Sequence, residues 1–315
     1  MNAAATDFST VDMRDAFFLR LYDIARQDPA VVLLSNDFGA PSLDRFRADL
    51  AGQFVNAAIS EQNMISMAAG MAMAGRKPVV YSIASFLTLR ALEQVKVDIC
   101  VMGAKVMLVG VGCGYAYSVD GPTHHATEDI AIMRALSGMA VWSPSESPVA
   151  GAMADLIHDL PGPAYLRFDR GRWPSLGELD LERGLRVLGS GDDVVIVATG
   201  IMTHRALAVA EALRQSGTAC RVVDLVRLSP PARSELAAAL AAAGRVVTIE
   251  EQAAPGGLGG LVAEFMADEG LLRPLLRLAI DPAKVFAYGE RDRLHRDRGL
   301  DLDGAVTRIG AWMGR

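Results

Sequence analysis

Short β-branched runs alternate with helix-forming stretches along this sequence, and this alternation limits the possible folds more than any other feature. In the first half, strands are predicted over 31–34, 54–58, 78–81, 106–111 and 164–167. The predicted helices between them cover 61–74, 86–102, 128–136 and 148–158. Such alternation is typical of parallel βαβ units with helices on both faces of a sheet. The sequence therefore predicts an α/β fold.

The 315 residues are enough for two domains, and the pattern indicates where they divide. Residues 169–191 contain Pro174, several glycines and mixed charge without a long periodic stretch, so we expect a linker there. A second α/β pattern follows. Its predicted strands are 194–198, 221–225 and 246–250, and its predicted helices are 203–215, 234–243 and 261–267. We expect two doubly wound domains, over 1–180 and 190–315.

Composition excludes several classes of protein. A net charge of −6 without a local block of Lys and Arg gives no footprint for nucleic acid, and the basic segment 291–298 is interleaved with acids and is interpreted as a solvated turn. Neither a signal peptide nor a bilayer-spanning run is predicted. The three separated cysteines, Cys100, Cys113 and Cys220, favour reduced thiols in the cytoplasm over disulfides or a zinc site.

The segment 56–64 places a carboxylate at the start of a helix. Ser60 is positioned to cap that helix, and Glu61 lies in its first turn. Glu61 in this position could simply complement the helix dipole. However, Ile59 and the small apolar helix that follows indicate a partly buried carboxylate, which then needs a partner.

The segment 84–94 has polar residues at helical spacing after an aromatic residue. Phe86 begins the predicted helix, and Arg90 and Glu93 recur along it. Phe86 could be an ordinary core residue and Arg90 with Glu93 an intrahelical pair. This segment decides nothing by itself.

The segment 119–129 has two adjacent histidines on a loop after a buried strand, where open α/β sheets bind ligands. The positive end of the helix predicted to follow would favour the neutral form of a histidine, which suits hydrogen bonding to substrate hydroxyls. A metal site is the rival interpretation. Adjacent histidines point in different directions and no further Cys or His cluster is near, so no metal ligand is predicted.

In this order and spacing, the three segments resemble the transketolase family. The sequence 60–63 is similar to its catalytic glutamate motif, 86–94 to its aminopyrimidine-binding helix and 120–124 to its substrate loop. The likeness continues through 194–200 and 250–260 in the second half. It implies a thiamine-diphosphate pyrimidine-binding domain followed by a transketolase C-terminal-like domain. Beta subunits of 2-oxo-acid dehydrogenases share the architecture but lack the Asp-Gly-Pro-Thr-His loop.

The resemblance implies a role for each matching residue. Glu61 would be catalytic, holding the cofactor's aminopyrimidine ring in the tautomer that activates the thiazolium carbon, and His124 would join it in catalysis. The implied cofactor-binding residues are Asp37, Phe38, Ile59, Glu61, Phe86 and Arg90. The implied substrate-binding residues are Asp120 and His124, for donor hydroxyls, and Arg167 and Arg170, for a phosphate. His125 is expected only to shape the turn.

Two departures from the family pattern refine this expectation. The chain lacks the Gly-Asp-Gly motif that holds the diphosphate through a divalent metal, since Gly191-Asp-Asp193 follows a different pattern in the predicted linker. It therefore resembles the C-terminal subunit of a split enzyme, whose N-terminal partner subunit holds diphosphate and Mg²⁺, in a heterotetramer with two copies of each chain. In addition, 111–117 lacks a histidine that many transketolases have, so the sugar substrate stays open.

Three functions remain in competition on the sequence. The leading one is transfer of a two-carbon ketol unit from a ketose or ketose phosphate to an aldehyde. The alternatives within the enzyme class are a 2-oxo-acid decarboxylase or dehydrogenase beta subunit and a 1-deoxyxylulose-5-phosphate-synthase-like carboligase. A non-catalytic assembly subunit is the third, and the retained Glu61 and Phe86 weigh against it.

Overall fold

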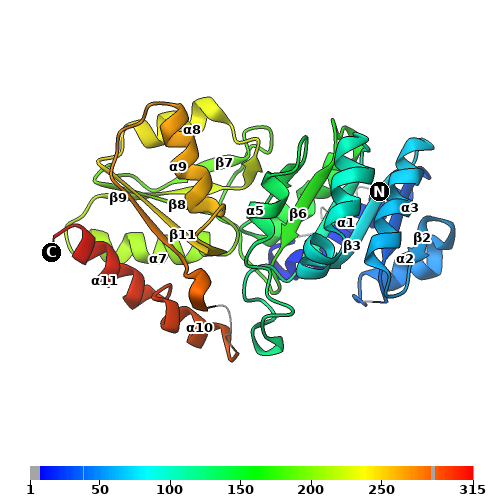
Figure 1. Ribbon diagram of the computed structural model, residues 1–315, viewed down its shortest axis with the longest axis horizontal. Coiled ribbons are helices and arrows are strands. Elements are labelled where there is room, and N and C mark those ends of the chain that lie inside the picture. The colour runs from blue at the N-terminus through cyan, green and yellow to red at the C-terminus, as the bar shows by residue number, and fades with distance from the viewer. Residues whose placement is uncertain (1–7, 38, 285–287, 315) are drawn as a thin grey trace. The chain divides into compact units, whose positions relative to one another are not determined.

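The computed structural model describes residues 8–37, 39–284 and 288–314 (Figure 1). The chain divides into two compact units. The first comprises Met1–Cys113 with Met133–Gly177, and the second comprises Gly114–Ile132 with Glu178–Arg315. Residues 114–132, here called loop 114–132, thus belong to the second unit, whereas the predicted domain boundary at 180–190 remains a prediction.

The first unit is built on parallel strands. They are β1 (Val31–Ser35), β2 (Phe54–Asn56), β3 (Lys77–Ile83), β4 (Met107–Val111), β5 (Ala140–Trp142) and β6 (Ala164–Phe168). They lie in the order β5-β6-β4-β3-β1-β2. Four of them, β1, β3, β4 and β6, are buried almost throughout, which explains their continuous apolar runs.

The strand order contains a reversal that locates a ligand site. From β1 the chain moves to β2 on one side and then to β3 on the other. Loops that leave neighbouring strands in opposite directions open a crevice at the carboxyl ends of those strands, where ligands of open α/β sheets bind. The loops after β1, β2 and β3 carry Asp37, Glu61 and Phe86 respectively.

The helices of the first half pack in two groups. They are α1 (Met13–Ala25), α2 (Leu43–Asp49), α3 (Glu61–Met73), α4 (Leu92–Gln94), α5 (Asp129–Arg134) and α6 (Ser147–Ala152). Helix α1 packs on α6, and α3 packs on β3 and on the 86–101 segment. That segment was predicted as one helix, and the structure forms it as π-helical turns, Phe86–Arg90 and Val95–Val101, on either side of α4.

The second unit has a smaller sheet in the order β12-β11-β8-β9-β7. Its strands are β7 (Leu185–Leu188), β8 (Val194–Ala198), β9 (Cys220–Leu225), β11 (Arg245–Ala253) and β12 (Leu275–Ile280), and a short strand β10 (Arg227–Ser229) follows β9. Only β7 among the sheet's described pairings runs antiparallel. Its helices are α7 (Met202–Gln215), α8 (Arg233–Ala241), α9 (Leu258–Asp268), α10 (Arg291–Arg298) and α11 (Leu302–Trp312).

Helices cover both faces of this second sheet, with α7 and α11 on one face and α8 and α9 on the other (Figure 1). The apolar core between α7, α11 and the sheet includes fully buried Val194, Ile196, Val222 and Ile309. The predicted fold class, α/β with two doubly wound domains, is confirmed.

Two further local predictions were wrong. The predicted linker 169–191 contains β7, which is short and half-buried and therefore lacks a long periodic pattern. The predicted solvated turn at 291–298 is helix α10, whose Leu294 and His295 are buried while Asp292, Arg293, Arg296 and Asp297 are exposed. Within the described residues, no helix is both long and apolar enough to cross a bilayer.

Candidate active site

Glu61 is a buried carboxylate at the first residue of α3. Its exposure is 4%, whereas the following residues Gln62 and Asn63 are exposed. Ser60 occupies the N-cap position as predicted, but its hydroxyl donates to the carbonyl of Ala57 and makes no capping hydrogen bond to the helix. Glu61 thus places a buried carboxylate at the helix start, and a buried carboxylate needs a polar partner.

Arg90 connects Glu61 to Phe86. Its guanidinium donates to Glu61 Oε1 at 3.0 Å and lies 4.2 Å from the centroid of the Phe86 ring. The Arg90 side chain is 47% exposed, so the ion pair has one buried member and one member that reaches water. Segments 29 residues apart in sequence thus bring a carboxylate, a cation and an aromatic face together.

The turn before Glu61 has an unusual backbone that side chains hold in place. Ala58 is the only non-glycine residue in the described chain with positive φ, at 52°. Its amide donates to Asn56 Oδ1 at 2.9 Å, and its carbonyl accepts from Asn36 Nδ2 at 2.8 Å. Left-handed backbone at a residue with a Cβ is strained, and such strain concentrates at functional sites.

The other predicted cofactor contacts lie on the same loops. Asp37 is exposed directly after β1, and Ile59 is 77% exposed in the turn between Ala58 and Glu61. Phe38 lies outside the described residues. Sequence reasoning missed Asn36, which is 5% exposed and ties the loop after β1 to the loop after β2. A lone asparagine at a strand end gives no pattern that could have identified it.

The predicted substrate residues Asp120 and His124 lie on loop 114–132. Asp120 ends a short 3₁₀ turn, Ser118–Asp120, and is exposed. The backbone amide of His124 donates to the Gly121 carbonyl at 2.9 Å, and its Nδ1 lies 2.9 Å from the Thr123 hydroxyl. Gly121 has φ of 77°, which a glycine adopts without strain, and so forms the turn that presents these side chains.

His125 is an internal support of the same loop. Its Nε2 lies 3.1 Å from the Ser118 carbonyl, and because a carbonyl can only accept, Nε2 carries the proton. The Tyr115 ring packs edge-on against it with centroids 4.9 Å apart. Burial lowers the pKa of His125, so its neutral form is favoured. The geometry agrees with the expectation that His125 shapes the turn.

Three consecutive residues at the end of β11 hold loop 114–132. The Tyr115 amide donates to Glu251 Oε2 at 3.2 Å. Gln252 donates to the Ala126 carbonyl and to Asp129 Oδ1, both at 2.8 Å. The Ala253 amide donates to the Thr127 carbonyl at 2.8 Å. The loop is thus fixed near both of its ends by a strand more than 120 residues away in sequence.

Glu251 is itself held by two side chains of α10. Arg291 Nε donates to Glu251 Oε1 at 2.8 Å, and His295 Nε2 contacts the same carboxylate. Burial alone would raise the pKa of Glu251, but the charge and hydrogen bonds of Arg291, followed by those of His295, outweigh it and hold the pKa well below its usual range. Sequence reasoning missed this network. The run of polar residues 250–252 at the end of an apolar strand was the available signal.

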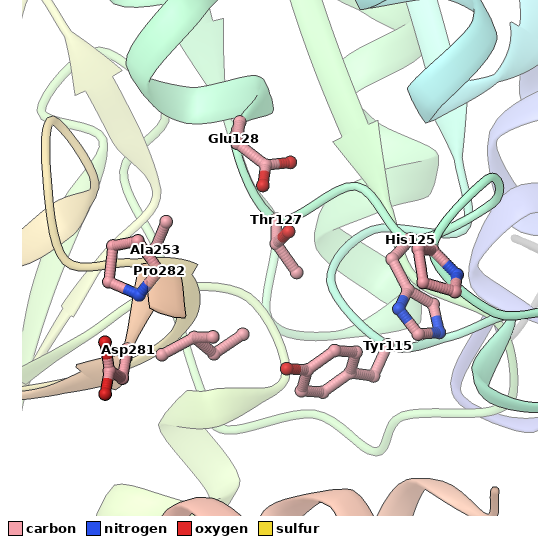
Figure 2. A pocket seen from close by; sticks show the side chains of 9 residues that line it. Tyr115, His125, Thr127, Glu128, Ala253, Asp281 and Pro282 are labelled. Carbon is pink, nitrogen blue, oxygen red and sulfur yellow. The ribbon is translucent and has the colours of Figure 1, made fainter. Parts of the chain in front are cut away.

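A small cavity lies behind the loop within the second unit. Figure 2 shows Tyr115, His125, Thr127 and Glu128 of loop 114–132 around it, together with Ala253, Asp281 and Pro282. Its volume is about 40 Å³. Since one water needs roughly 10–15 Å³ on this measure, the cavity holds a few waters and is too small for a sugar.

The two predicted phosphate-binding arginines differ in environment. Arg167, near the end of β6, is buried and donates to the Ser143 hydroxyl at 3.0 Å. Arg170 follows the strand and is exposed. Both lie at the carboxyl edge of the first sheet, the same edge as Glu61. Among the described residues, no group of three or more His, Cys, Asp or Glu side chains could hold a metal ion.

Residues 9–174 match the transketolase pyrimidine-binding domain, and residues 184–303 match the transketolase C-terminal domain. The chain is 32% identical over 296 residues to one of the subunits of apulose-4-phosphate transketolase from Phocaeicola vulgatus. That match covers 92% of this chain and 94% of the relative.

Two further relatives are similar over most of their length. The 6-deoxy-6-sulfo-D-fructose transketolase subunit SqwH of a Clostridium species is 33% identical over 275 residues, which covers 85% of this chain and 84% of that protein. A split-gene transketolase solved as an inactive β4 tetramer superposes with a TM-score of 0.87 at 31% identity, over 96% of this chain and 98% of that one. Through both of its domains, as its motifs predicted, the chain belongs to the transketolase family.

Proposed function

We propose that this chain is the C-terminal, pyrimidine-binding subunit of a two-chain thiamine-diphosphate-dependent transketolase. The observation that carries the proposal is the buried Glu61 at the start of α3, paired with Arg90, whose guanidinium lies over the Phe86 ring. The relatives named as transketolase subunits, which match this chain over most of their length, support a split enzyme.

The residues present fit the pyrimidine end of thiamine diphosphate. A buried carboxylate accepts a hydrogen bond from a protonated ring nitrogen more strongly than an exposed one, because little water competes. Phe86 is half-buried and offers a ring face, and Ile59 offers exposed apolar surface in the turn that leads into Glu61. Asn36 Oδ1 is a buried acceptor without a partner among the described residues, on the same loop as Asp37.

When bound, thiamine diphosphate supplies the carbon nucleophile and the electron sink for ketol transfer. Glu61 holds the proton at the pyrimidine ring nitrogen, and Arg90 fixes the orientation of the Glu61 carboxylate. Phe86 and Ile59 exclude water from that hydrogen bond. Asp120 and His124, presented by the turn at Gly121, bind and orient the donor hydroxyls, and His124 exchanges a proton with one of them.

The donor is a ketose that carries an anionic group. The relatives' names contain a phosphorylated and a sulfonated sugar, and Arg167 and Arg170 offer guanidinium groups at the carboxyl edge of the sheet. The planar guanidinium of arginine can donate two hydrogen bonds to the oxygens of a phosphate or of a sulfonate, so the site can accept either group.

The partner subunit holds the diphosphate and Mg²⁺, for which this chain has no Gly-Asp-Gly motif. We propose a heterotetramer with two copies of each chain. Apolar side chains exposed on α3 and the packed 86–102 segment support an interface there: Met73, Leu89, Val97, Val101 and Met102. Met64, in contrast, is fully buried in the core of this chain. The free thiols of all three cysteines support a cytoplasmic enzyme.

Reconstitution tests this function. The chain is mixed with a partner polypeptide that carries Gly-Asp-Gly, thiamine diphosphate and Mg²⁺, and ketol transfer from ketose phosphates to an aldehyde is followed. We expect no activity from the chain alone and turnover from the mixture. Glu61→Gln should lower kcat by about 10²–10⁴-fold, since it removes the proton-holding carboxylate.

Glu178→Gln is the matched control, because it makes the same chemical change at an exposed carboxylate outside the 86–102 segment. It should leave kcat within about twofold. Full activity of the isolated chain would contradict the split enzyme. Turnover of a 2-oxo acid with a lipoyl acceptor, and none with a ketose, would contradict the transketolase reaction.

A further inference from the structure

A second cavity of about 240 Å³ lies in the first unit, at the amino ends of its strands. Its basic lining residues are Arg76, Lys77, Lys105 and His158, and its apolar wall includes Ile157 and Leu160. Glu61 and the other predicted site residues of this unit lie near the opposite, carboxyl ends of the strands. The cavity is therefore distinct from the candidate active site.

The sheet places Arg76 and Lys105, which line this cavity, at the same edge. Arg76 directly precedes β3 and Lys105 lies two residues before β4. These strands are parallel neighbours, with Val79 opposite Met107, so the residues that enter them meet at one edge. The sequence spacing of 29 residues gives no hint of this pairing.

The cavity has an excess of positive charge. Lys77 forms an ion pair with Asp28, with Nζ 2.9 Å from Oδ2. Asp28 also interacts electrostatically with His158. Arg76 and Lys105 are exposed and make no ion pair within the described part of the chain. No carboxylate lines the cavity itself. Arg76 and Lys105 therefore line the cavity without a counter-ion, which favours an anionic ligand.

The end of α3 does not oppose an anion here. The carbonyls of a helix C-terminus carry partial negative charge, but those of the last turn of α3 are already occupied. The Gly70, Met71 and Ala72 carbonyls accept from the amides of Ala74, Arg76 and Gly75 at 3.0–3.1 Å. Gly75, with φ of 83°, closes this turn.

We propose that this cavity binds a small phosphate-bearing molecule. Arg76 offers a planar fork of donors that matches two phosphate oxygens, and Lys105 adds a compact point charge. Ile157 and Leu160 provide apolar surface for a short carbon chain attached to the phosphate. A volume of 240 Å³ is below the roughly 300–1,000 Å³ of pockets for drug-sized ligands, so the site suits inorganic phosphate or a small phosphate ester.

Calorimetric titration of the full chain tests this site independently of the proposed reaction. The probes are inorganic phosphate and glycerol 3-phosphate, which is neither a ketose nor an aldehyde. We expect saturable binding of at least one probe. Tighter binding of glycerol 3-phosphate would identify an ester as the ligand, and equal binding would identify free phosphate. The double variant Arg76→Ala/Lys105→Ala should weaken binding by about tenfold or more.

Lys96→Ala/Arg296→Ala is the matched control. It removes the same two charges from exposed residues outside the cavity, so the net charge falls equally and binding should not change. Circular dichroism checks that both double variants are folded, as expected from the exposure of all four side chains. Absence of saturable binding to the wild-type chain, or equal weakening in both variants, would overturn the proposal.

Discussion

At the scale of single residues, Arg90 has the most informative position in the first unit. It contacts the buried carboxylate of Glu61 at one side and the ring of Phe86 at another. About half of the Arg90 side chain reaches water, so solvent screens the contribution of the ion pair to stability. The hydrogen bond still orients the Glu61 carboxylate. Arg90 is a positioning residue, which acts through Glu61.

Replacement of Arg90 should separate these two effects. Arg90→Ala should change the free energy of unfolding by about 1 kcal/mol or less, yet lower kcat by about tenfold to a hundredfold in the reconstituted enzyme. Arg90→Lys keeps the charge but loses the flat contact with Phe86, and should recover only part of the activity. Thermal unfolding and steady-state kinetics measure the two quantities. A large loss of stability without loss of kcat would contradict the positioning role.

At the scale of elements, the Glu250 side chain caps the N-terminus of helix α9, which follows the glycine-rich turn 256–260. Glu250 Oε1 accepts from the Gly259 amide at 2.7 Å, and its Oε2 accepts from the Leu258 amide. A Cβ at Gly257 would lie against Glu250 Oε2 and 2.9 Å from the Ala253 carbonyl. The turn 256–260 therefore serves the fold, and Glu250 fills the position where such turns can hold a phosphate.

Two glycine substitutions test this cap. Gly257→Ala should destabilise the protein by about 1–2 kcal/mol, because the new methyl group displaces the Glu250 carboxylate from the helix start. Gly260→Ala is the control, since nothing lies nearer than 3.9 Å to a Cβ at this helical position. It should be neutral or stabilising by up to about 1 kcal/mol. Differential scanning calorimetry compares them, and equal melting temperatures would refute the steric argument.

The network of Glu251, Arg291 and His295 predicts a pH dependence. The folded-state pKa of Glu251 is lowered, so the native state holds its proton less tightly than the unfolded chain does. The stabilisation is thus complete above the ordinary glutamate pKa of about 4.3 and is lost as the pH falls below it toward the folded-state pKa. Loop 114–132 should loosen over the same range, since Tyr115 depends on Glu251.

Glu251→Gln isolates this contribution. It leaves Arg291 and buried His295 facing a neutral amide, so we expect a loss of about 3 kcal/mol at pH 7, near the lower end of values for broken buried pairs. The difference from the wild-type chain should shrink as the pH falls from 5 toward 3. Melting temperatures across this range measure it, and a difference independent of pH would exclude Glu251 as the titrating group.

At the scale of the whole molecule, the chain exposes apolar surface where the proposed partner docks. Val101 is 71% exposed and Met102 57% exposed, next to α3, whose Ser66 hydroxyl contacts Asp98 in the same segment. Single exposed apolar residues are ordinary, but several on two packed elements indicate an interface.

A charge placed in this surface should impair assembly. Val101→Asp should weaken heterotetramer formation by about tenfold or more, because the carboxylate would lose water at the interface. Leu272→Asp is the control, since Leu272 is 90% exposed in the second unit and lies outside this surface. Analytical ultracentrifugation with the partner subunit distinguishes them. Unchanged assembly of the Val101 variant would place the interface elsewhere.

The sequence by itself determined the α/β class, most strand positions and the start of α3 at Glu61. Strands such as β1, β4 and β8 are fully buried and therefore continuous in apolar residues, and Glu61 interrupts an apolar neighbourhood, so both leave local signals. Helix α10 was missed because its buried residues, Leu294 and His295, stand among charges that hide its short apolar face.

Only the tertiary structure decided which charges meet. Arg90 pairs with Glu61 rather than with Glu93, Arg76 and Lys105 line one cavity at the edge of the sheet, and Glu251 accepts a hydrogen bond from the Tyr115 amide. These contacts join residues 29 to 136 positions apart. Their partners are set by strand order and register. For Glu251, which is buried, the pairing with α10 is also strongly favoured, because an unpaired buried charge is costly. No local pattern in a sequence records such a choice.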